Sequence, residues 1–230
     1  MTQPSSTDAR LPAGFGSSTL VVGVADCGRL TPVRWGITLA SQQYPMNMAV
    51  DYASPEDAIG IREDQVRNAT VEYTMMTQGK LLWFVDSDVL PPNYAVQRLF
   101  HEMINKPEVM VVAGIYFSKQ DKPTPVVFEE GGKGPYFGWN EGEVFEVPGF
   151  IGAGCMLIRA ELFNKIPPPY FVREEYPDKV TDDAFFCRKV KAAGYKVLGH
   201  GGVLCGHYDH RTRKVIQPEQ VMKTWKRIAI

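Results

Sequence analysis

The sequence has 230 residues, of which 44% are hydrophobic and 22% charged, so it can bury one sizeable core and suits one large domain better than two small ones. Its 25 basic and 26 acidic residues give a formal net charge of -1. This balance excludes an overall positive potential that would attract nucleic acid or an anionic membrane, although a local basic patch is still compatible with it. The cysteines are far apart and form no Cys-x-x-Cys pair, which argues against a disulfide framework and indicates free thiols in a reducing cytosol.

The sequence shows no signal for membrane insertion or export. No apolar run approaches the roughly 20 residues of a membrane-spanning helix. Residues 1–18 include Arg10 but lack the apolar stretch of a signal peptide, so we expect a flexible leader. These features predict a cytoplasmic protein.

Three very apolar runs bounded by polar residues predict buried central strands. Segments of helical length separate them, and the last of these follows Pro91-Pro92, as helix starts often do. In chain order, the predicted elements are strand 20–25, helix 33–43, helix 61–77, strand 81–85, helix 93–104 and strand 109–114. Strands and helices at this spacing predict an α/β sheet with parallel strands.

The middle of the chain changes character. Residues 119–149 are rich in Gly, Pro and aromatic residues, and the alternation at 143–147 predicts a short hairpin on one side of the sheet. A long irregular segment of this kind often forms a binding surface or a lid. Regular structure then returns, and the predicted elements are strand 155–159, short helix 160–165, helix 182–193 and strand 196–198.

Two carboxylates follow the predicted strand 81–85, in the run Asp86-Ser87-Asp88. Ligands of open α/β sheets bind at the carboxyl ends of strands, and two carboxylates one residue apart can hold one hard cation against substrate phosphates. The string alone is a weak signal, because chance often produces it in a chain of this composition. The alternative is that Asp86 caps the following helix and Asp88 is solvated.

Asp182 and Asp183 open the predicted helix 182–193, directly after Thr181. Thr181 or Asp182 makes a good N-cap, and acidic residues in a first turn favour the helix dipole, so capping alone explains much of this pattern. The alternative is that one of the two carboxylates faces a cleft. There it would remove the proton of an acceptor hydroxyl as a general base.

A third cluster contains His207 and follows a short strand and a Gly-rich turn at 199–203. A loop position makes His207 a better ligand for a divalent ion than a core residue. The alternative is a zinc site, which lacks a second closely spaced thiolate pair. Its ligands would be His200, Cys205, His207 and His210.

Arg67 and Asn68 lie in the predicted helix 61–77. On a solvated helix face, Arg67 would pair with Asp64 or Glu63. In a binding site, Arg67 would instead lie near the diphosphate of a nucleotide ligand, and Asn68 would fix a loop. Periodicity alone does not choose between these two interpretations.

In this order, these pieces resemble the compact glycosyltransferases of the family-two-like GT-A superfamily, which includes short bacterial and phage members. The resemblance covers about residues 20 to 210 and lies in the ordered set of segments rather than in any one motif. The matching segments are VVGVADCGRLTPVRWGITLASQQYP, REDQVRNATVEYTMMTQGKLLWFVDSDVLPP, VVAGIYFSKQDKPTPVV, GFIGAGCMLIRAELFNKIPPPYF and TDDAFFCRKVKAAGYKV.

The resemblance implies an α/β fold of the GT-A type, with a single Rossmann-like domain. Its mixed, mostly parallel central sheet would be flanked by helices, with a small hairpin or flap region added. This domain would cover residues 19–210, after the leader 1–18. Residues 211–230 would form a basic C-terminal tail or helix that packs on the site or covers it.

The resemblance also implies the ligands and the residues that bind them. A divalent cation, Mn²⁺ or Mg²⁺, would be held by Asp86, Asp88 and His207. Asp183 matches the catalytic base of inverting members, and Asp182 replaces the family's Glu, so either carboxylate is a candidate for the catalytic role. The donor would be a nucleotide-sugar, with UDP favoured and GDP as the alternative. The residues implied in donor binding are Asp26, Arg67, Asn68, Asp86, Ser87, Gly152 and Gly154.

The implied function is transfer of a hexosyl or pentosyl group from a nucleoside-diphosphate-sugar to a hydroxyl of a glycan or small molecule. An alternative is a phage-type enzyme that glycosylates a modified base of DNA in the host cytoplasm, because basic residues lie near the C-terminus. These are His210, Arg211, Arg213, Lys214, Lys223, Lys226 and Arg227. A nucleotidyltransferase, or an inactive sugar- or nucleotide-binding module that uses Tyr136, Phe137 and Trp139 as a stacking platform, would also be compatible with these features. The sequence does not indicate an oligomeric state.

Overall fold

The structure of the protein is a computed structural model. It describes residues 18–25, 31–53, 61–174 and 180–228. Asp26, predicted to contact the donor base, and most of the predicted leader lie outside these residues. In the described part of the chain, no helix is both long enough and apolar enough to cross a membrane.

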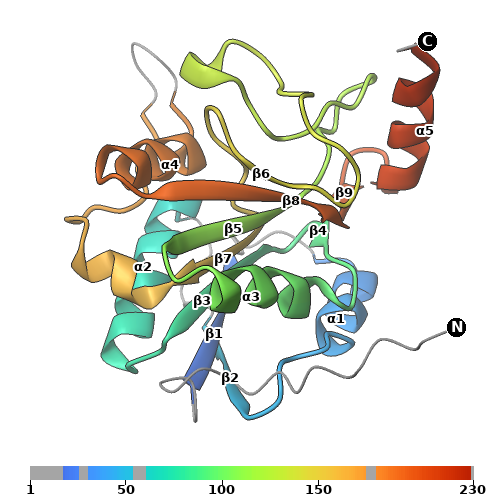
Figure 1. The fold of residues 1–230 in the computed structure, drawn as a ribbon. Coiled ribbons are helices and arrows are strands. Elements are labelled where there is room, and N and C mark those ends of the chain that lie inside the picture. Colours follow the sequence, from blue (N-terminus) through green and yellow to red (C-terminus); the bar gives the residue numbers. More distant parts are fainter. Residues whose placement is uncertain (1–17, 26–30, 54–60, 175–179, 229–230) are drawn as a thin grey trace, which may run out of the picture.

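A seven-stranded mixed sheet forms the centre of this part of the chain (Figure 1). Five of its strands run in one direction, whereas β7 and the edge strand β6 run against their neighbours. In spatial order the strands are β2 (Met48–Ala53), β1 (Ser18–Ala25), β3 (Leu81–Asp86), β7 (Cys155–Arg159), β5 (Val109–Ile115), β8 (Lys196–Leu204) and β6 (Val144–Glu146). The prediction of a mixed, mostly parallel sheet is therefore confirmed.

Helices cover both faces of the sheet. The buried apolar side chains of α2 and α4 belong to one core cluster, and those of α1 and α3 belong to a second one on the opposite face. The helices are α1 (Val33–Ala40), α2 (Glu63–Met76), α3 (Ala95–Asn105), α4 (Asp182–Ala192) and α5 (Pro218–Ile228), with short 3-10 helices η1 (Glu130–Gly132) and η2 (Ala160–Asn164).

Strand β3 connects this core to the predicted site. Its side chains alternate between the two clusters, so that Leu82 and Phe84 pack with α2 and α4, while Trp83 and Val85 pack with α1 and α3. A strand covered on both faces is apolar throughout, which explains the unbroken hydrophobic run. The strand ends at Asp86, so the first predicted carboxylate lies at the carboxyl edge of the sheet.

A second sheet of three strands stands at the carboxyl end of β3 (Figure 1). In order, its strands are β10 (Lys214–Ile216), β9 (Gly206–Asp209) and β4 (Val89–Leu90). Val89 of β4 pairs with His207 of β9. The N–H of Tyr208 also donates to the carbonyl of Asp88 at 2.7 Å. This pairing places His207 next to Asp88, although the two are far apart in sequence.

The predicted hairpin at 143–147 is wrong. β6 is a single edge strand that pairs antiparallel with β8, where Val144 lies opposite His200. The alternation in the sequence marks a strand with one buried side chain, Phe145, and its pairing partner comes much later in the chain. Local alternation indicated the strand correctly but not its partner.

The predicted Gly-rich turn at 199–203 lies within β8, which continues to Leu204 with a register shift against β5 after His200. A Cβ added at Gly199 would lie 2.5 Å from Cζ of Phe145. Glycine is therefore needed here for close packing of β6 on β8 rather than for a turn. Helix α1 ends at Ala40, before the predicted end at Gln43. Strands β2, β4, β9 and β10 have no counterpart in the sequence prediction.

Candidate functional site

Asp86 ends β3 and is fixed through both its main chain and its side chain. Its N–H donates to the carbonyl of Gly154 at 3.1 Å, and its carbonyl accepts a 2.8 Å hydrogen bond from Nε1 of Trp35. Its Oδ1 accepts a 2.8 Å hydrogen bond from Nη2 of Arg67. Burial raises the pKa of Asp86 to about 6, although Arg67 acts in the opposite direction. One oxygen of this carboxylate is thus already engaged by a protein cation.

Asp88 is 9% exposed and lies between a histidine and a lysine. Its Oδ1 is 3.6 Å from Nε2 of His207, and its Oδ2 forms an ion pair with the ammonium group of Lys119. Burial alone would raise the pKa of the Asp88 carboxyl, but His207 and Lys119 outweigh it and hold this pKa well below its usual value. Asp88 therefore stays charged and is paired with a cation.

The His207 ring is held in place from its other side. Its Nδ1 lies 2.7 Å from the carbonyl oxygen of Phe117, which can only accept, so Nδ1 carries a proton. Nε2 is then the ring atom that faces Asp88. The ring also packs edge to face on Tyr116, with centroids 5.0 Å apart. A carbonyl behind one ring nitrogen is the arrangement that orients a histidine as a metal ligand through the other nitrogen.

Tyr116 and Lys119 belong to this site but are absent from the sequence prediction. Both follow β5, so the rule that ligands bind at the carboxyl ends of strands also indicates these two residues. The Tyr116 hydroxyl lies 3.4 Å from the N–H of Gly154 and accepts its hydrogen bond. Burial, together with the charges of Asp86 and Asp183, holds the pKa of Tyr116 well above its usual value. Tyr116 is therefore a neutral hydroxyl beside the carboxylates.

Arg67 links two carboxylates that are far apart in sequence. It is 3% exposed, and it donates from Nη2 to Asp86 and from Nε to Asp182, each at 2.8 Å. Its guanidinium lies over the rings of Phe84, at 5.3 Å, and Phe171, at 5.9 Å. Burial lowers the pKa of Arg67, but the two carboxylates outweigh it and hold this pKa well above its usual value. Arg67 is therefore a permanent buried cation at the centre of the site.

The surface interpretation of Arg67 is thus wrong. Asp64 pairs with Arg62 instead, at 2.5 Å. The buried Nη1 of Arg67 has no hydrogen-bond partner among the described residues. A buried donor without an acceptor is costly, so a ligand oxygen at Nη1 remains a prediction of the binding-site interpretation.

Asn68 fixes a loop, as one interpretation of the sequence expects. Its Nδ2 donates to the carbonyl of Phe171 at 2.6 Å, and its Oδ1 accepts from the N–H of Tyr170 at 2.9 Å. Ser87 is buried in the turn between β3 and β4. Contacts of Asn68 and Ser87 with the donor remain predictions.

The start of α4 gives Asp182 and Asp183 different surroundings. Asp182 is buried and accepts the hydrogen bond from Arg67. Asp183 accepts a 2.8 Å hydrogen bond from the N–H of Ala184 and another from the hydroxyl of Thr181. Thr181 occupies the N-cap position but makes no side-chain capping bond. Burial, followed by the charge of Asp182, raises the pKa of Asp183 to about 6.

Gly152 and Gly154 are required by close packing. A Cβ added at Gly152 would lie 2.0 Å from Oη of Tyr116, and one added at Gly154 would lie 2.9 Å from Oδ2 of Asp86. There is no room for a side chain at either position, so both residues must be glycine. Their contact with a donor sugar remains a prediction.

Comparisons with known proteins bear on the fold alone. No protein-family model and no curated protein matches the sequence. The crystal structure of A197 from STIV matches with a TM-score of 0.61 at 17% identity, covering 87% of this chain and 93% of that one. The crystal structure of GalNAc-T7 with UDP, GalNAc and Mn2+ matches with a TM-score of 0.56 at 12% identity, covering 85% of this chain and 44% of that one. The chain has a GT-A-like fold.

The zinc alternative has no support in this GT-A-like fold. Within the described ranges, no three His, Cys, Asp or Glu side chains converge as a ready-made metal site. His200 lies in β8, where its Nδ1 accepts a 3.0 Å hydrogen bond from the N–H of Gly202. Asp88 and His207 form a pair, and Asp86 turns one oxygen towards Arg67. Direct metal binding by Asp86 remains a prediction.

The aromatic segment mostly packs against the protein itself. Trp139 is buried and stacks on Phe145 with ring centroids 5.9 Å apart. The hydroxyl of Tyr136 donates to the carbonyl of Gly138 at 2.7 Å. Only Phe137 among the three predicted platform residues is well exposed, at 51%. This arrangement gives little support to a three-ring sugar platform.

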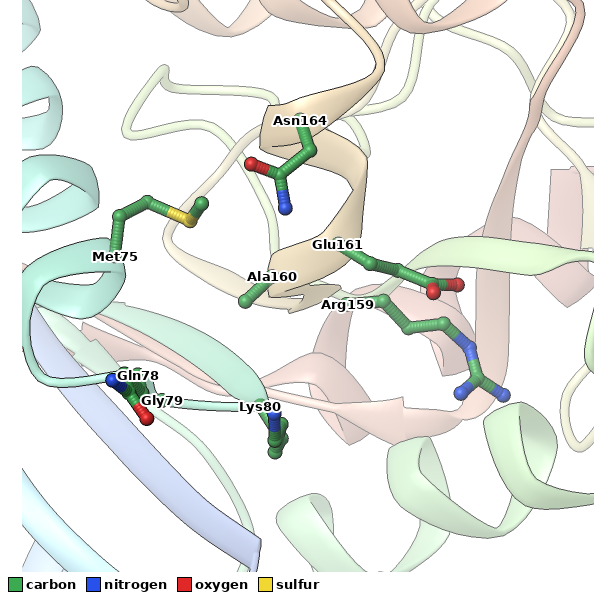
Figure 2. A pocket seen from close by; sticks show the side chains of 8 residues that line it. All are labelled: Met75, Gln78, Gly79, Lys80, Arg159, Ala160, Glu161 and Asn164. Atoms are coloured by element: carbon green, nitrogen blue, oxygen red, sulfur yellow. The ribbon is translucent and has the colours of Figure 1, made fainter. Parts of the chain in front are cut away.

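Figure 2 shows a pocket at the opposite end of β3. Its lining residues are Met75, Gln78, Gly79, Lys80, Arg159, Ala160, Glu161 and Asn164. Lys80 precedes β3 and Asp86 ends it, so a strand length of about 20 Å separates this pocket from the carboxylates. Arg159 is held by the carbonyl of Val109 at 2.9 Å. The pocket is therefore separate from the site at Asp88.

Proposed function

We propose that the protein is a metal-dependent glycosyltransferase of the family-two-like GT-A group. It moves a hexosyl or pentosyl group from a nucleoside-diphosphate-sugar, with UDP favoured, to an acceptor hydroxyl. The observation that carries this proposal is the Asp88–His207 pair at the carboxyl end of β3. At the same strand end, Arg67 pairs with both Asp86 and Asp182, and so connects this end of β3 to the start of α4. The fold neighbour GalNAc-T7 was solved with UDP, GalNAc and Mn2+, which supports the same ligand classes here.

The residues at Asp88 fit a divalent cation. Two ligands that share one cation at bonds of about 2.0–2.2 Å lie roughly 3.0–3.5 Å apart. The separation of 3.6 Å between Asp88 Oδ1 and His207 Nε2 is close to this range and is longer than a hydrogen bond. A carboxylate and an imidazole suit Mn²⁺, and we propose Oδ2 of Asp86 as the third ligand. When bound, the cation supplies the positive charge that stabilises the leaving nucleoside diphosphate.

Asp183 is the proposed base. Asp182 is paired with the Arg67 cation, whereas the described partners of Asp183 are neutral donors. A pKa of about 6 leaves Asp183 mostly ionised at neutral pH and basic enough to take a proton. The acceptor oxygen attacks the anomeric carbon of the sugar, the bond from that carbon to the diphosphate breaks, and the hydroxyl proton passes to Asp183.

Arg67 is the proposed positioning residue of this machinery. Its two hydrogen bonds set the spacing between Asp86, on the cation side, and Asp182, beside the base. The planar guanidinium also fixes the direction of Nη1, which has no hydrogen-bond partner among the described residues. A phosphate oxygen would be a suitable acceptor for the Nη1 hydrogen bond. We therefore propose that Arg67 also binds the donor diphosphate, as the sequence predicts.

Product analysis tests the reaction class. The protein is incubated with Mn²⁺ and a panel of UDP- and GDP-sugars, and the released nucleotide is identified by mass spectrometry. Release of a nucleoside diphosphate supports glycosyl transfer, or donor hydrolysis when no acceptor is present. Release of a sugar 1-phosphate, with transfer of the nucleotidyl group to an acceptor or to added pyrophosphate, would instead indicate a nucleotidyltransferase. Tight binding of a nucleotide-sugar without turnover of any donor would indicate an inactive binding module.

A further inference from the structure

A second cavity opens beside Asp88. It has a volume of about 650 Å³ and lies between the segment after β5, the β9–β10 hairpin and helix α5. Lys119 lines it, and the ammonium group of the same residue forms the ion pair with Asp88. One side chain, Lys119, therefore belongs both to the cavity lining and to the ion pair at Asp88. A volume of this size suits a small organic molecule rather than a single ion.

The rim of this cavity is basic. Its cationic residues are Lys119, Lys122, Arg211 and Lys214. Among the described residues, neither Lys122 nor Lys214 has an ion-pair partner, and both are exposed. Exposed ammonium groups without an ion-pair partner in the lining of one cavity favour an anionic ligand.

The acidic residues of the same cavity do not cancel this charge. Asp209 is directed inwards, where it accepts hydrogen bonds from the N–H of Arg211 at 3.0 Å and from the hydroxyl of Thr212 at 2.8 Å. It therefore holds the β9–β10 turn in shape, and only 8% of it is exposed. Asp121 is the one remaining acid in the lining. Lys119 is paired with Asp88, and Arg211 lies 4.0 Å from Asp209. Lys122 and Lys214 remain against Asp121, so the lining keeps a net positive charge.

The floor of the cavity is apolar. Val215 and Ile216 of β10, with Val221 of α5, contribute partly buried or buried aliphatic side chains, and Pro123 also lines the cavity. An apolar floor under a basic rim suits a molecule with a ring or chain at one end and a phosphate at the other.

The place of the cavity in the sheet decides which substrate it fits. β1 lies on one side of β3, and β5 lies on the other side beyond β7. The nucleoside is expected on the β1 side, where the sequence resemblance places base recognition. The cavity is built on the segment that follows β5, on the opposite side of Asp88. It is therefore positioned for the acceptor.

We propose that this cavity binds the phosphate group of a phosphorylated acceptor and presents the acceptor's hydroxyl to the sugar donor held beside Asp88. The inference rests on the proposed function, because it names the acceptor class of the same reaction. Lys122 and Lys214 bind the phosphate, and Lys119 marks the boundary between the acceptor and the cation site.

Direct binding without turnover tests this proposal. Phenyl phosphate is titrated against the metal-free protein and followed by ³¹P line broadening, with phenol as the probe that lacks the phosphate. The variant Lys122→Glu/Lys214→Glu is compared with Lys80→Glu/Lys133→Glu, which changes the net charge equally at residues that do not line the cavity. We expect the cavity variant to lose about tenfold or more in affinity for phenyl phosphate, and the control variant to bind like the wild type.

Two further titrations identify the source of the phosphate. Affinity for UDP in the presence of Mn²⁺ should stay within about twofold of wild type in the cavity variant. An equal loss for UDP would overturn the proposal, because the cavity would then hold the donor diphosphate. Binding of a short DNA duplex that is tighter than that of phenyl phosphate, and is lost in the cavity variant, would also overturn it in favour of a nucleic-acid acceptor.

Failure of this inference is distinguishable from failure of the proposed function. Donor hydrolysis by water reports the donor chemistry without any acceptor. Nucleoside diphosphate release together with no phenyl phosphate binding rejects the acceptor cavity and leaves the glycosyltransferase proposal standing. Phenyl phosphate binding lost only in the cavity variant supports the cavity even where no tested sugar donor is turned over.

Discussion

Nε2 of His207 lies 3.6 Å from Oδ1 of Asp88, while Lys119 occupies the other oxygen of the same carboxylate. The lysine ammonium thus supplies a positive charge at the place proposed for a divalent cation. A divalent cation on Oδ1 and the ammonium group on Oδ2 would repel each other across one carboxylate, so an entering cation competes with Lys119.

This competition predicts that Lys119→Met binds Mn²⁺ about tenfold more tightly than the wild type, because the internal cation is removed and the hydrophobic replacement has a similar length. The measurement is a titration of free Mn²⁺ by electron paramagnetic resonance. Lys122→Met, which alters a cationic residue of the same cavity outside the Asp88 contact, should leave the affinity unchanged. Weaker Mn²⁺ binding by Lys119→Met would show that the lysine supports the cation rather than competing with it.

Removal of the Arg67 cation should destabilise the fold. Arg67→Met leaves two buried carboxylates without their partner, and breaking a buried ion pair in this way costs about 3–5 kcal/mol. The free energy of unfolding is measured in urea at neutral pH. Adding Asp182→Asn to the variant should recover part of the loss, since one of the unpaired charges is then removed. A variant as stable as the wild type would contradict the central position given to Arg67.

The proposed base predicts how activity depends on pH. With its pKa of about 6, Asp183 is protonated below pH 6, so kcat/KM should fall about tenfold per pH unit there. Asp183→Asn should lose most of the activity at every pH, whereas Asp121→Asn should keep the wild-type profile. A profile in which Asp183→Asn retains the wild-type rate would assign the base to another residue.

The same pKa has a consequence for stability. The folded-state pKa of Asp183 lies above the ordinary value of 3.8, so the folded protein binds this proton more tightly than the unfolded chain does. This contribution to stability is complete at pH values below the unfolded pKa and is lost as the pH rises towards 6. Asp183→Asn should therefore gain stability over the wild type at pH 8 and much less at pH 4, as measured by urea unfolding at both values. An equal difference at both pH values would contradict the raised pKa.

Close packing at Gly152 predicts a large difference between two glycine substitutions. Gly152→Ala forces a methyl group against the Tyr116 hydroxyl and should destabilise the protein by about 1–3 kcal/mol. Gly36→Ala places its methyl group in open space on α1 and should be neutral or stabilise the protein by up to about 1 kcal/mol. Thermal unfolding compares the two. Similar effects at both positions would argue against the tight packing of Gly152.

The parts of the site that follow local rules were predictable from the sequence. The apolar run of β3 and the carboxylates after it indicate a buried strand that ends near Asp86, and the structure has this strand. β2 escaped prediction because it is an edge strand with mostly half-exposed residues, so its pattern is weak. Strand pairing was the least predictable feature, since β6 finds its partner in β8 rather than in a neighbouring hairpin strand.

The links between distant residues could not be read from the sequence. Arg67 and Asp182 are 115 positions apart, and on a helix Arg67 looks like a partner for the nearer Asp64 or Glu63. Lys119 stands in a polar segment that resembles ordinary solvated surface. The position of both residues depends on how β5 and α4 pack around β3, which is tertiary information.

The Mn²⁺ dependence of nucleoside diphosphate release tests the central claim most directly. The rate of release from the best donor is measured over a Mn²⁺ titration for the wild type, Asp88→Asn and His207→Ala. We expect the wild type to require the metal and both variants to lose about a hundredfold or more at saturating donor while remaining folded. A wild-type rate that is unchanged in excess chelator, or an unchanged rate in Asp88→Asn, would contradict the claim that Asp88 and His207 hold a catalytic cation.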